Sequence, residues 1–202
     1  MPRLLRHGFA DPVLASQRVF RAVMNALARP GRIEPLATDL GPPAPLTPEL
    51  GAIALSLADH EAALWLDPPL AEAESVGAYL RFHTGCRLAS DPSEAAFALI
   101  SDPAACPPFE SFALGSQEYP DRSATLLFAV TDLSNENGFV LRGPGILDSA
   151  RFHAAPLPAD MPERLDTNRA RFPRGVDYIF TAPGRVAGLP RTTELVGGGA
   201  CM

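Results

Sequence analysis

Two apolar runs decide the fold class of this chain of 202 residues: AAFALIS at residues 95–101 and TLLFAVT at residues 125–131. Runs of this length and composition are typical of strands that are buried on both faces of a sheet. Two further strands of the same kind are predicted at residues 62–66 and 176–181. The chain is therefore expected to have a sheet whose central strands lie away from water.

Helices are predicted between these strands. The first runs from Asp11 to Ala28, because Asp11 suits the N-cap and Pro12 the first helical position, and it ends at Arg29-Pro30-Gly31. Others are expected to begin at Thr47-Pro48 and to cover residues 72–83 and 162–172. The alternation of helices and buried strands predicts an α/β fold, with a mixed β-sheet covered by helices on both faces.

The length and composition fit one domain over residues 1–202, with residues 196–202 expected to form a loose tail. A short strand is predicted at residues 139–142, and an edge strand at residues 185–195. We find no internal repeat and no stretch that would serve as an interdomain linker.

The composition narrows the class of function. The net charge of −6 argues against nucleic acid as a partner, because phosphate backbones are bound by excess positive charge. All 17 basic residues are arginine. Without lysine there is no Schiff base to pyridoxal phosphate and no phosphate-loop lysine, so those two chemistries are excluded in their usual forms and no cofactor is expected.

The cysteines and the N-terminal residues bear on the compartment. The three cysteines, Cys86, Cys106 and Cys201, are widely spaced, which suits free thiols in a reducing environment. No apolar run is long enough to span a bilayer, and the first residues lack the apolar core of a signal peptide. We therefore expect a cytoplasmic protein without a membrane segment.

An anion site is suggested by Arg142-Gly143-Pro144-Gly145-Ile146, at the end of a predicted strand. Gly143 and Gly145 would let backbone N–H groups approach a ligand closely, and the guanidinium of Arg142 offers two parallel donors to a phosphate or phosphonate. A tight turn that happens to follow an arginine also explains the same residues.

Two other segments carry groups that could bind an anion or move a proton. Arg191 and Thr192 offer a compact set of donors, although an ordinary edge strand also fits them. His83 has the ordinary pKa of a general acid or base, although the following Gly85 is typical of a helix C-cap.

The arginine-rich stretch at residues 168–177 has two interpretations. It fits a patch for an anion or a protein partner, and it also fits a helix C-terminus whose dipole attracts cations. In the second case Asp177 would pair with Arg174.

No catalytic residue and no metal site are assigned. The serines of residues 115–125 lack a nucleophile elbow, so this segment is expected to be a surface loop. The histidines and cysteines lack the spacing of metal ligands. The candidate site residues are therefore contacts to an anion or substrate: Arg142, Gly143, Gly145, Arg191, Thr192 and His83.

Short blocks of the chain, taken together, resemble the PhnH family, a subunit family of the bacterial carbon–phosphorus lyase system that degrades phosphonates. Each block is weak alone, but six in order at suitable separations are specific. The blocks are Gln17–Arg21 with Ala28–Gly31, Phe82–Cys86, Ser123–Leu126, Gly143–Ile146, Phe172–Asp177 and Leu189–Thr193.

The resemblance implies a fold similar to that of the pyridoxal-phosphate-dependent transferases, without their cofactor. It also implies a homodimer that joins PhnG, PhnI and PhnJ in a core complex. With PhnG, PhnI and PhnL, the family supports attack of a phosphonate on ribose C1 of ATP. Adenine leaves and a ribose 1-phosphonate 5-triphosphate forms, which is the reaction of an alpha-D-ribose 1-methylphosphonate 5-triphosphate synthase. PhnJ later cleaves the carbon–phosphorus bond.

A second function stays open at this stage. PhnI is the usual candidate for the transfer step in this family, and each block of the chain also has a structural explanation. Under this second interpretation, the chain is a non-catalytic dimeric scaffold that docks PhnG, PhnI and PhnJ.

Overall fold

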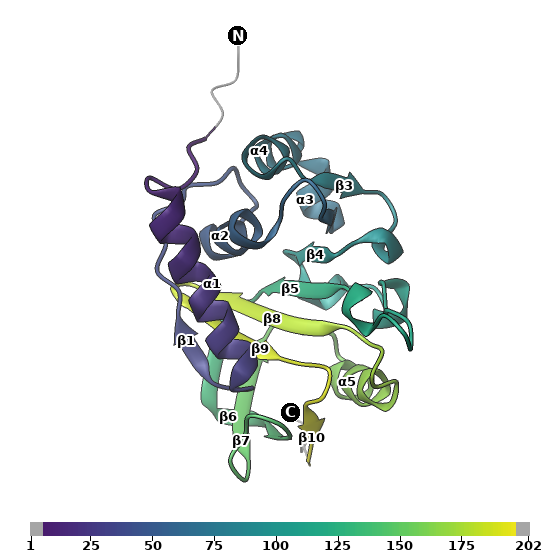
Figure 1. Cartoon of the computed structure of the whole chain (residues 1–202). Helices are drawn as coiled ribbons and strands as arrows, with labels where there is room; N and C mark the ends of the chain where they lie inside the picture. Colours follow the sequence, from purple (N-terminus) through teal and green to yellow (C-terminus); the bar gives the residue numbers. More distant parts are fainter. Residues whose placement is uncertain (1–5, 197–202) are drawn as a thin grey trace.

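A mixed sheet of seven strands forms the centre of the structure (Figure 1). The computed structural model of the chain describes residues 6–196. The helices are α1 (Pro12–Ala28), α2 (Pro48–Leu57), α3 (Pro68–Glu72), α4 (Glu74–Thr84) and α5 (Met161–Ala170). The strands are β1 (Ile33–Pro35), β2 (Ala63–Leu66), β3 (Arg87–Ala89), β4 (Phe97–Ile100), β5 (Thr125–Ala129), β6 (Asp132–Arg142), β7 (Ala150–Ala155), β8 (Asp177–Ala182), β9 (Arg185–Leu189) and β10 (Glu194–Leu195).

The order of strands in the large sheet is β1-β9-β8-β5-β4-β2-β3. The five strands from β8 to β3 run parallel, and β9 is antiparallel to both of its neighbours, β8 and β1. The other three strands form a small antiparallel sheet in the order β10-β6-β7. The prediction of a mixed sheet is therefore confirmed.

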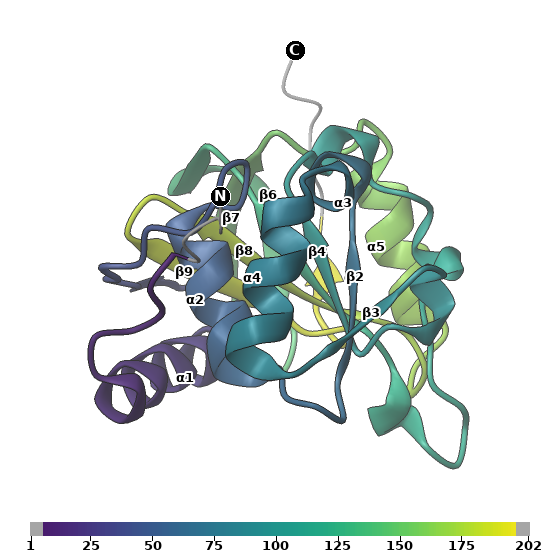
Figure 2. The same cartoon turned by 90° about the horizontal axis from the view of Figure 1, so that it is seen from above.

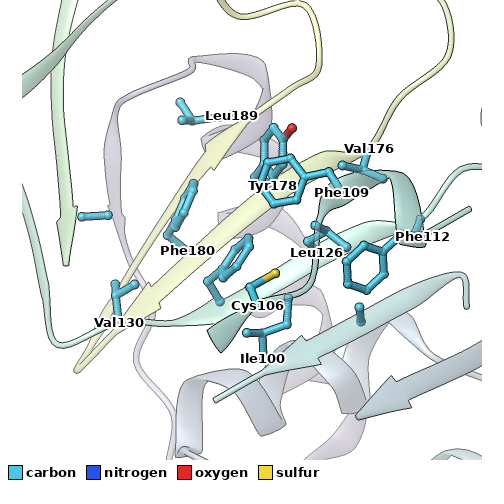
Figure 3. Packing of buried hydrophobic residues seen from close by; sticks show 14 of the residues in the cluster. Ile100, Cys106, Phe109, Phe112, Leu126, Val130, Val176, Tyr178, Phe180 and Leu189 are labelled. Carbon is cyan, nitrogen blue, oxygen red and sulfur yellow. The ribbon is translucent and has the colours of Figure 1, made fainter. Parts of the chain in front are cut away.

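The two apolar runs that predicted the fold are the central strands β4 and β5. Their side chains point alternately to the two faces of the sheet, so Leu126 and Phe128 enter one buried cluster and Leu127 the other. Figure 3 shows the first cluster, where Leu126 lies near Phe109 and Phe112. Both faces of these strands are therefore withdrawn from water, as the sequence predicted.

Helices cover both faces of the sheet (Figure 2). Buried residues of α1, α2 and α4 belong to one cluster, and those of α5 belong to the other. The small sheet covers part of the α5 face, because Leu133, Leu141 and Phe152 join the same cluster. None of the helices described combines the length with the apolar character that crossing a membrane would require.

The helix expected at residues 72–83 is α4, which begins at Glu74 because the preceding helix α3, with its own N-cap Asp67, ends at Glu72. One strand prediction is wrong in detail. The edge strand expected at residues 185–195 is two strands. β9 is no edge, because it lies between β8 and β1, whereas β10 lies at the edge of the small sheet. β9 ends at Leu189 because Pro190 has no N–H to donate, and the chain then crosses to the small sheet.

Three strands were not predicted: β1, β3 and β7. β1 and β3 have three residues each, which is too short for a periodic pattern to be recognised. The predicted loose tail lies outside the described residues apart from Val196, whose N–H donates to the carbonyl oxygen of Val140 at 2.8 Å. Cys201 lies outside them as well.

Cys86 and Cys106 are free thiols in the core. Burial raises the pKa of the Cys106 thiol from 9.0 to about 12, although the nearby charge of Arg164 opposes the shift. The folded state therefore resists ionisation of this thiol more than the unfolded chain does.

We expect the free energy of unfolding to fall as the pH rises from 9 towards 12, because only the unfolded chain ionises Cys106 readily in that window. The thiol contributes a slope of at most about 1.4 kcal/mol per pH unit. Urea unfolding at several pH values checks this, with Cys106→Ala as the control. The two proteins should show the same slope below pH 8 and diverge above pH 9, and parallel curves throughout would contradict the expectation.

Candidate functional site

The segment Gly143–Ile146 is a tight turn after β6. The N–H of Ile146 donates to the carbonyl oxygen of Gly143 at 3.2 Å, and Gly145 has a φ of 82°, so the turn is of type II with Pro144 at its second position. A side chain at Gly145 would overlap the carbonyl oxygen of Ala28 at the end of α1. The turn interpretation is confirmed, and anion binding by the same residues stays a prediction.

Four of the six candidate residues lie in this part of the molecule. Arg142 is exposed and faces Glu194 of β10 in the ladder of the small sheet. Gly143 lies against the backbone of Thr192, where a Cβ would come within 3.1 Å of the carbonyl oxygen. Residues 142–145 and Thr192 are thus brought together although about fifty residues separate them in the sequence.

Arg191 has no donor left over for an anion. Its guanidinium Nε and Nη2 donate to Asp177, at 3.2 Å and 2.5 Å, and Nη2 also donates to the hydroxyl of Ser123. Nη1 donates to the carbonyl oxygens of Pro120 and Pro173, at 3.0 Å and 3.2 Å. All five N–H groups are engaged within the protein, so an anion would have to displace one of these partners.

The partner of Asp177 is therefore Arg191, and the pairing with Arg174 that the sequence suggested is wrong. Only 12% of the Arg191 side chain and 25% of the Asp177 side chain are exposed. Burial and the nearby charge of Asp177 raise the pKa of Tyr178 well above its ordinary value. Tyr178 therefore stays a neutral phenol and is not available as a base.

His83 lies far from the other candidates, because α4 and β6 are at opposite ends of the molecule in Figure 1. Its Nε2 lies 3.0 Å from the carbonyl oxygen of Arg6, and its ring packs on Tyr79. Gly85 ends α4 in the left-handed conformation with a φ of 72°, so the C-cap prediction is confirmed. His83 thus holds residues preceding α1 against α4.

The carboxyl ends of β2 and β4 are where open α/β sheets commonly bind an anionic ligand. Here the buried carboxylate of Asp67 occupies that place. Its oxygens accept from the N–H groups of Leu70, Ser101 and Asp102, at 3.3, 2.6 and 2.8 Å. Donors that could hold a phosphate are thus bound to the protein's own carboxylate.

A hollow of about 390 Å³ lies beside the Gly143–Ile146 turn. Three arginines line it: Arg29 and Arg32 from the segment after α1, and Arg151 from β7. Arg29 was predicted to be part of a helix stop and lies in one of the PhnH blocks, whereas Arg32 and Arg151 belong to no predicted motif. Nothing in the linear pattern relates these arginines, because 118 positions lie between Arg32 and Arg151.

A metal site is not found in the part of the chain described, where no three His, Cys, Asp or Glu side chains lie close enough to hold an ion. The serines of residues 115–125 lie in a loop that contains a short 3-10 turn, Pro120–Arg122. Anion binding through guanidinium and backbone groups is the chemistry that this region of the molecule offers.

A family model described as "Bacterial phosphonate metabolism protein (PhnH)" matches residues 7–196. The chain belongs to the PhnH family. It is 45% identical over 187 residues to the alpha-D-ribose 1-methylphosphonate 5-triphosphate synthase subunit PhnH of Rhizobium meliloti (strain 1021), covering 93% of each chain. It is 34% identical over 184 residues to the putative C-P lyase subunit protein HtxG of Stutzerimonas stutzeri, covering 89% of this chain and 85% of that one.

The resemblance drawn from short blocks is thereby confirmed, and the structure shows how those PhnH blocks meet. Three of them, represented by Ser123, Asp177 and Arg191, join at the Arg191 guanidinium. Two others meet where Gly145 packs on Ala28. Most of the blocks that resemble the family therefore lie at two junctions between segments that are distant in the sequence.

We expect Arg191→Ala to lower the free energy of unfolding by about 3 kcal/mol, because it removes the charge that pairs with the largely buried Asp177 and leaves two carbonyl oxygens without partners. Urea unfolding checks this. Arg142→Ala is the matched control, since the side chain is exposed and its loss should cost less than about 0.5 kcal/mol. Equal stability of the two variants would show that the Arg191 contacts are not structural.

Proposed function

We propose that this chain is a subunit of the carbon–phosphorus lyase core complex in organophosphonate catabolism. In that complex it supports the transfer of a phosphonate to ribose C1 of ATP. The observation that carries the proposal is the 45% identity, over 93% of both chains, to a subunit of alpha-D-ribose 1-methylphosphonate 5-triphosphate synthase. A likeness that extends over nearly the whole of both chains favours a shared role.

The reaction needs little from a protein nucleophile. An oxygen of the phosphonate forms a bond to C1 while the bond from C1 to the adenine nitrogen breaks, and adenine leaves with a proton. Both substrates are polyanions, so the protein groups that matter are cations and backbone donors that position them. The contacts predicted at Arg142, Gly143, Gly145 and Thr192 are of this kind and remain part of the proposal.

The partners are proposed on the family resemblance: a homodimer that joins PhnG, PhnI, PhnJ and PhnL in the cytoplasm. The same resemblance supports a fold like that of the pyridoxal-phosphate-dependent transferases, now used without the cofactor. A sheet with helices on both faces is compatible with it. The lack of lysine supports the loss of the cofactor, because no aldimine can form.

A surface that fits a partner subunit lies on α1. Val13, Phe20 and Met24 are 66%, 51% and 49% exposed, and their spacing of seven and four residues places them on one face of the helix. Large apolar side chains grouped in this way on an exposed face mark a protein interface. We call this the α1 face.

The charge around the α1 face indicates what binds it. No acidic residue occurs from Pro12 to Arg32, whereas that segment contains four arginines in a chain of net charge −6. Two copies packed through α1 would bring like charges together, which is unfavourable. The α1 face therefore fits a different subunit, with an apolar groove bordered by acidic residues.

We expect the double variant Phe20→Ser/Met24→Ser to fold normally but to lose its partner subunits, because both side chains are exposed and central to the face. Loss of an apolar anchor weakens such an interface by about 2 kcal/mol, or roughly thirtyfold. Co-purification from cells grown on methylphosphonate as sole phosphorus source measures this.

The matched control for the α1 variant is Tyr119→Ser, which removes an aromatic side chain of similar exposure from a distant loop. It should co-purify with the same proteins as the wild-type chain. Recovery of the wild-type chain without any protein of phosphonate metabolism would contradict the proposed function. Normal assembly of Phe20→Ser/Met24→Ser would contradict only the assignment of the α1 face.

The second candidate function is a scaffold that docks PhnG, PhnI and PhnJ and contributes no contact to substrate. The internal use of every donor of Arg191 favours it, because a residue predicted to bind an anion has a structural role instead. The α1 face is compatible with both candidates.

Arg142→Ala separates the two functions. If the subunit contributes an anion contact at this residue, the variant should assemble normally and fail to support growth on methylphosphonate, because the exposed guanidinium is lost without harm to the fold. If the chain is a scaffold, growth should match that of wild type. Growth curves of a complemented deletion strain, with co-purification as the assembly control, measure the difference.

A further inference from the structure

We propose that the hollow between the end of α1 and β7 binds the tetrahedral oxyanion of a phosphonate or phosphate ester through Arg29 and Arg151. We call it the arginine hollow. The choice of phosphorus oxyanions rests on the proposed function, while the position of the site rests on the geometry of this chain.

Two guanidiniums in the arginine hollow are free of internal partners. Among residues 6–196, neither Arg29 nor Arg151 makes a side-chain hydrogen bond or ion pair, and both are exposed to solvent. Arg32 is held by Glu34, with Nε 2.8 Å from Oε1. No acidic residue lines the hollow, so it carries a net positive charge in a chain whose overall charge is −6.

The backbone is arranged to keep these arginines together. The side-chain amide of Asn135 donates to the carbonyl oxygen of Gly31 and to that of Arg151, both at 2.6 Å. One amide group thus joins the segment that carries Arg29 to the strand that carries Arg151. Asn135 is a positioning residue, because it acts through the segments that it holds.

The turn at Gly145 forms another wall of the hollow. Gly145 packs on the carbonyl oxygen of Ala28, which fixes the turn against the end of α1. Figure 1 shows this end of α1 close to β6 and β7, where the small sheet begins. The hollow is therefore built from segments that the fold holds in place.

The size and charge of the arginine hollow indicate which class of ligand it binds. A volume of about 390 Å³ fits a small molecule rather than a macromolecule. Guanidiniums prefer planar pairs of oxygens such as those of phosphates and phosphonates. The C-terminal end of α1 contributes about half a negative charge, which the two unpaired guanidiniums exceed. A free phosphonate and the triphosphate of a nucleotide both supply this oxyanion.

Titration calorimetry of the purified full chain tests the proposal, with methylphosphonate, tripolyphosphate and ATP as probes and adenosine as the uncharged control. We expect at least one of the three anions to bind with a Kd below about 10 mM, and adenosine not to bind. Arg29→Gln/Arg151→Gln should weaken binding at least tenfold. Arg87→Gln, which removes an exposed arginine far from the hollow, should leave it unchanged.

Binding of methylphosphonate alone would identify a free phosphonate as the ligand, and binding of tripolyphosphate and ATP alone would identify a nucleotide triphosphate; either result supports the site. No binding of any anion, or equal binding by the double variant, would overturn it. Urea unfolding verifies that the variants fold. Co-purification and growth report separately on the proposed function, so either conclusion can fail without the other.

Discussion

The fold depends on one buried cation, the guanidinium of Arg191. Its contacts join the start of β8 at Asp177, the end of the loop before β5 at Ser123 and Pro120, and the turn after α5 at Pro173. These segments meet at the amino ends of two central parallel strands, where the N–H of Asp177 also donates to the carbonyl oxygen of Ala124 at 3.4 Å. Because all five donors are engaged and the pair with Asp177 is largely buried, removal of either partner leaves charges and carbonyl groups unsatisfied. This explains why short stretches around these residues identify the family: they are the parts of one junction.

A second junction joins the end of α1 to the small sheet. Gly145 can approach the carbonyl oxygen of Ala28 only because it has no side chain, and Asn135 connects Gly31 with Arg151. The two junctions differ in whether the arginine side chains keep unpaired N–H groups. Every N–H group of the Arg191 guanidinium is engaged within the protein. Arg29 and Arg151 make no side-chain hydrogen bond among the described residues, and both line the hollow. Free guanidiniums next to a rigid backbone are the more suitable place for a ligand, since binding there displaces no internal partner.

This difference explains where the predicted site residues and the residues that line the hollow disagree. Arg142 and Arg191 were predicted as anion contacts because they lie next to glycines or hydroxyl groups. Arg29 was predicted as part of a helix stop, and Pro30 and Gly31 do end α1. His83 matched a catalytic type, but the fold places it at the far end of the molecule, against residues that precede α1. Residue type indicates what a side chain can do, whereas the availability of its donors depends on neighbours that are distant in the sequence.

The class of the fold, the positions of the buried strands and the chemical limits of a chain without lysine follow from the amino-acid sequence alone. Apolar runs and helix caps are local features, and local features predict local structure. The folded structure was needed to show which strand lies at an edge, which arginine pairs with Asp177 and which arginines line the same hollow. Arg191 donates to Pro120 and Ser123 from 71 and 68 positions away, and Asn135 donates to Gly31 across 104 positions, and no local pattern encodes such contacts.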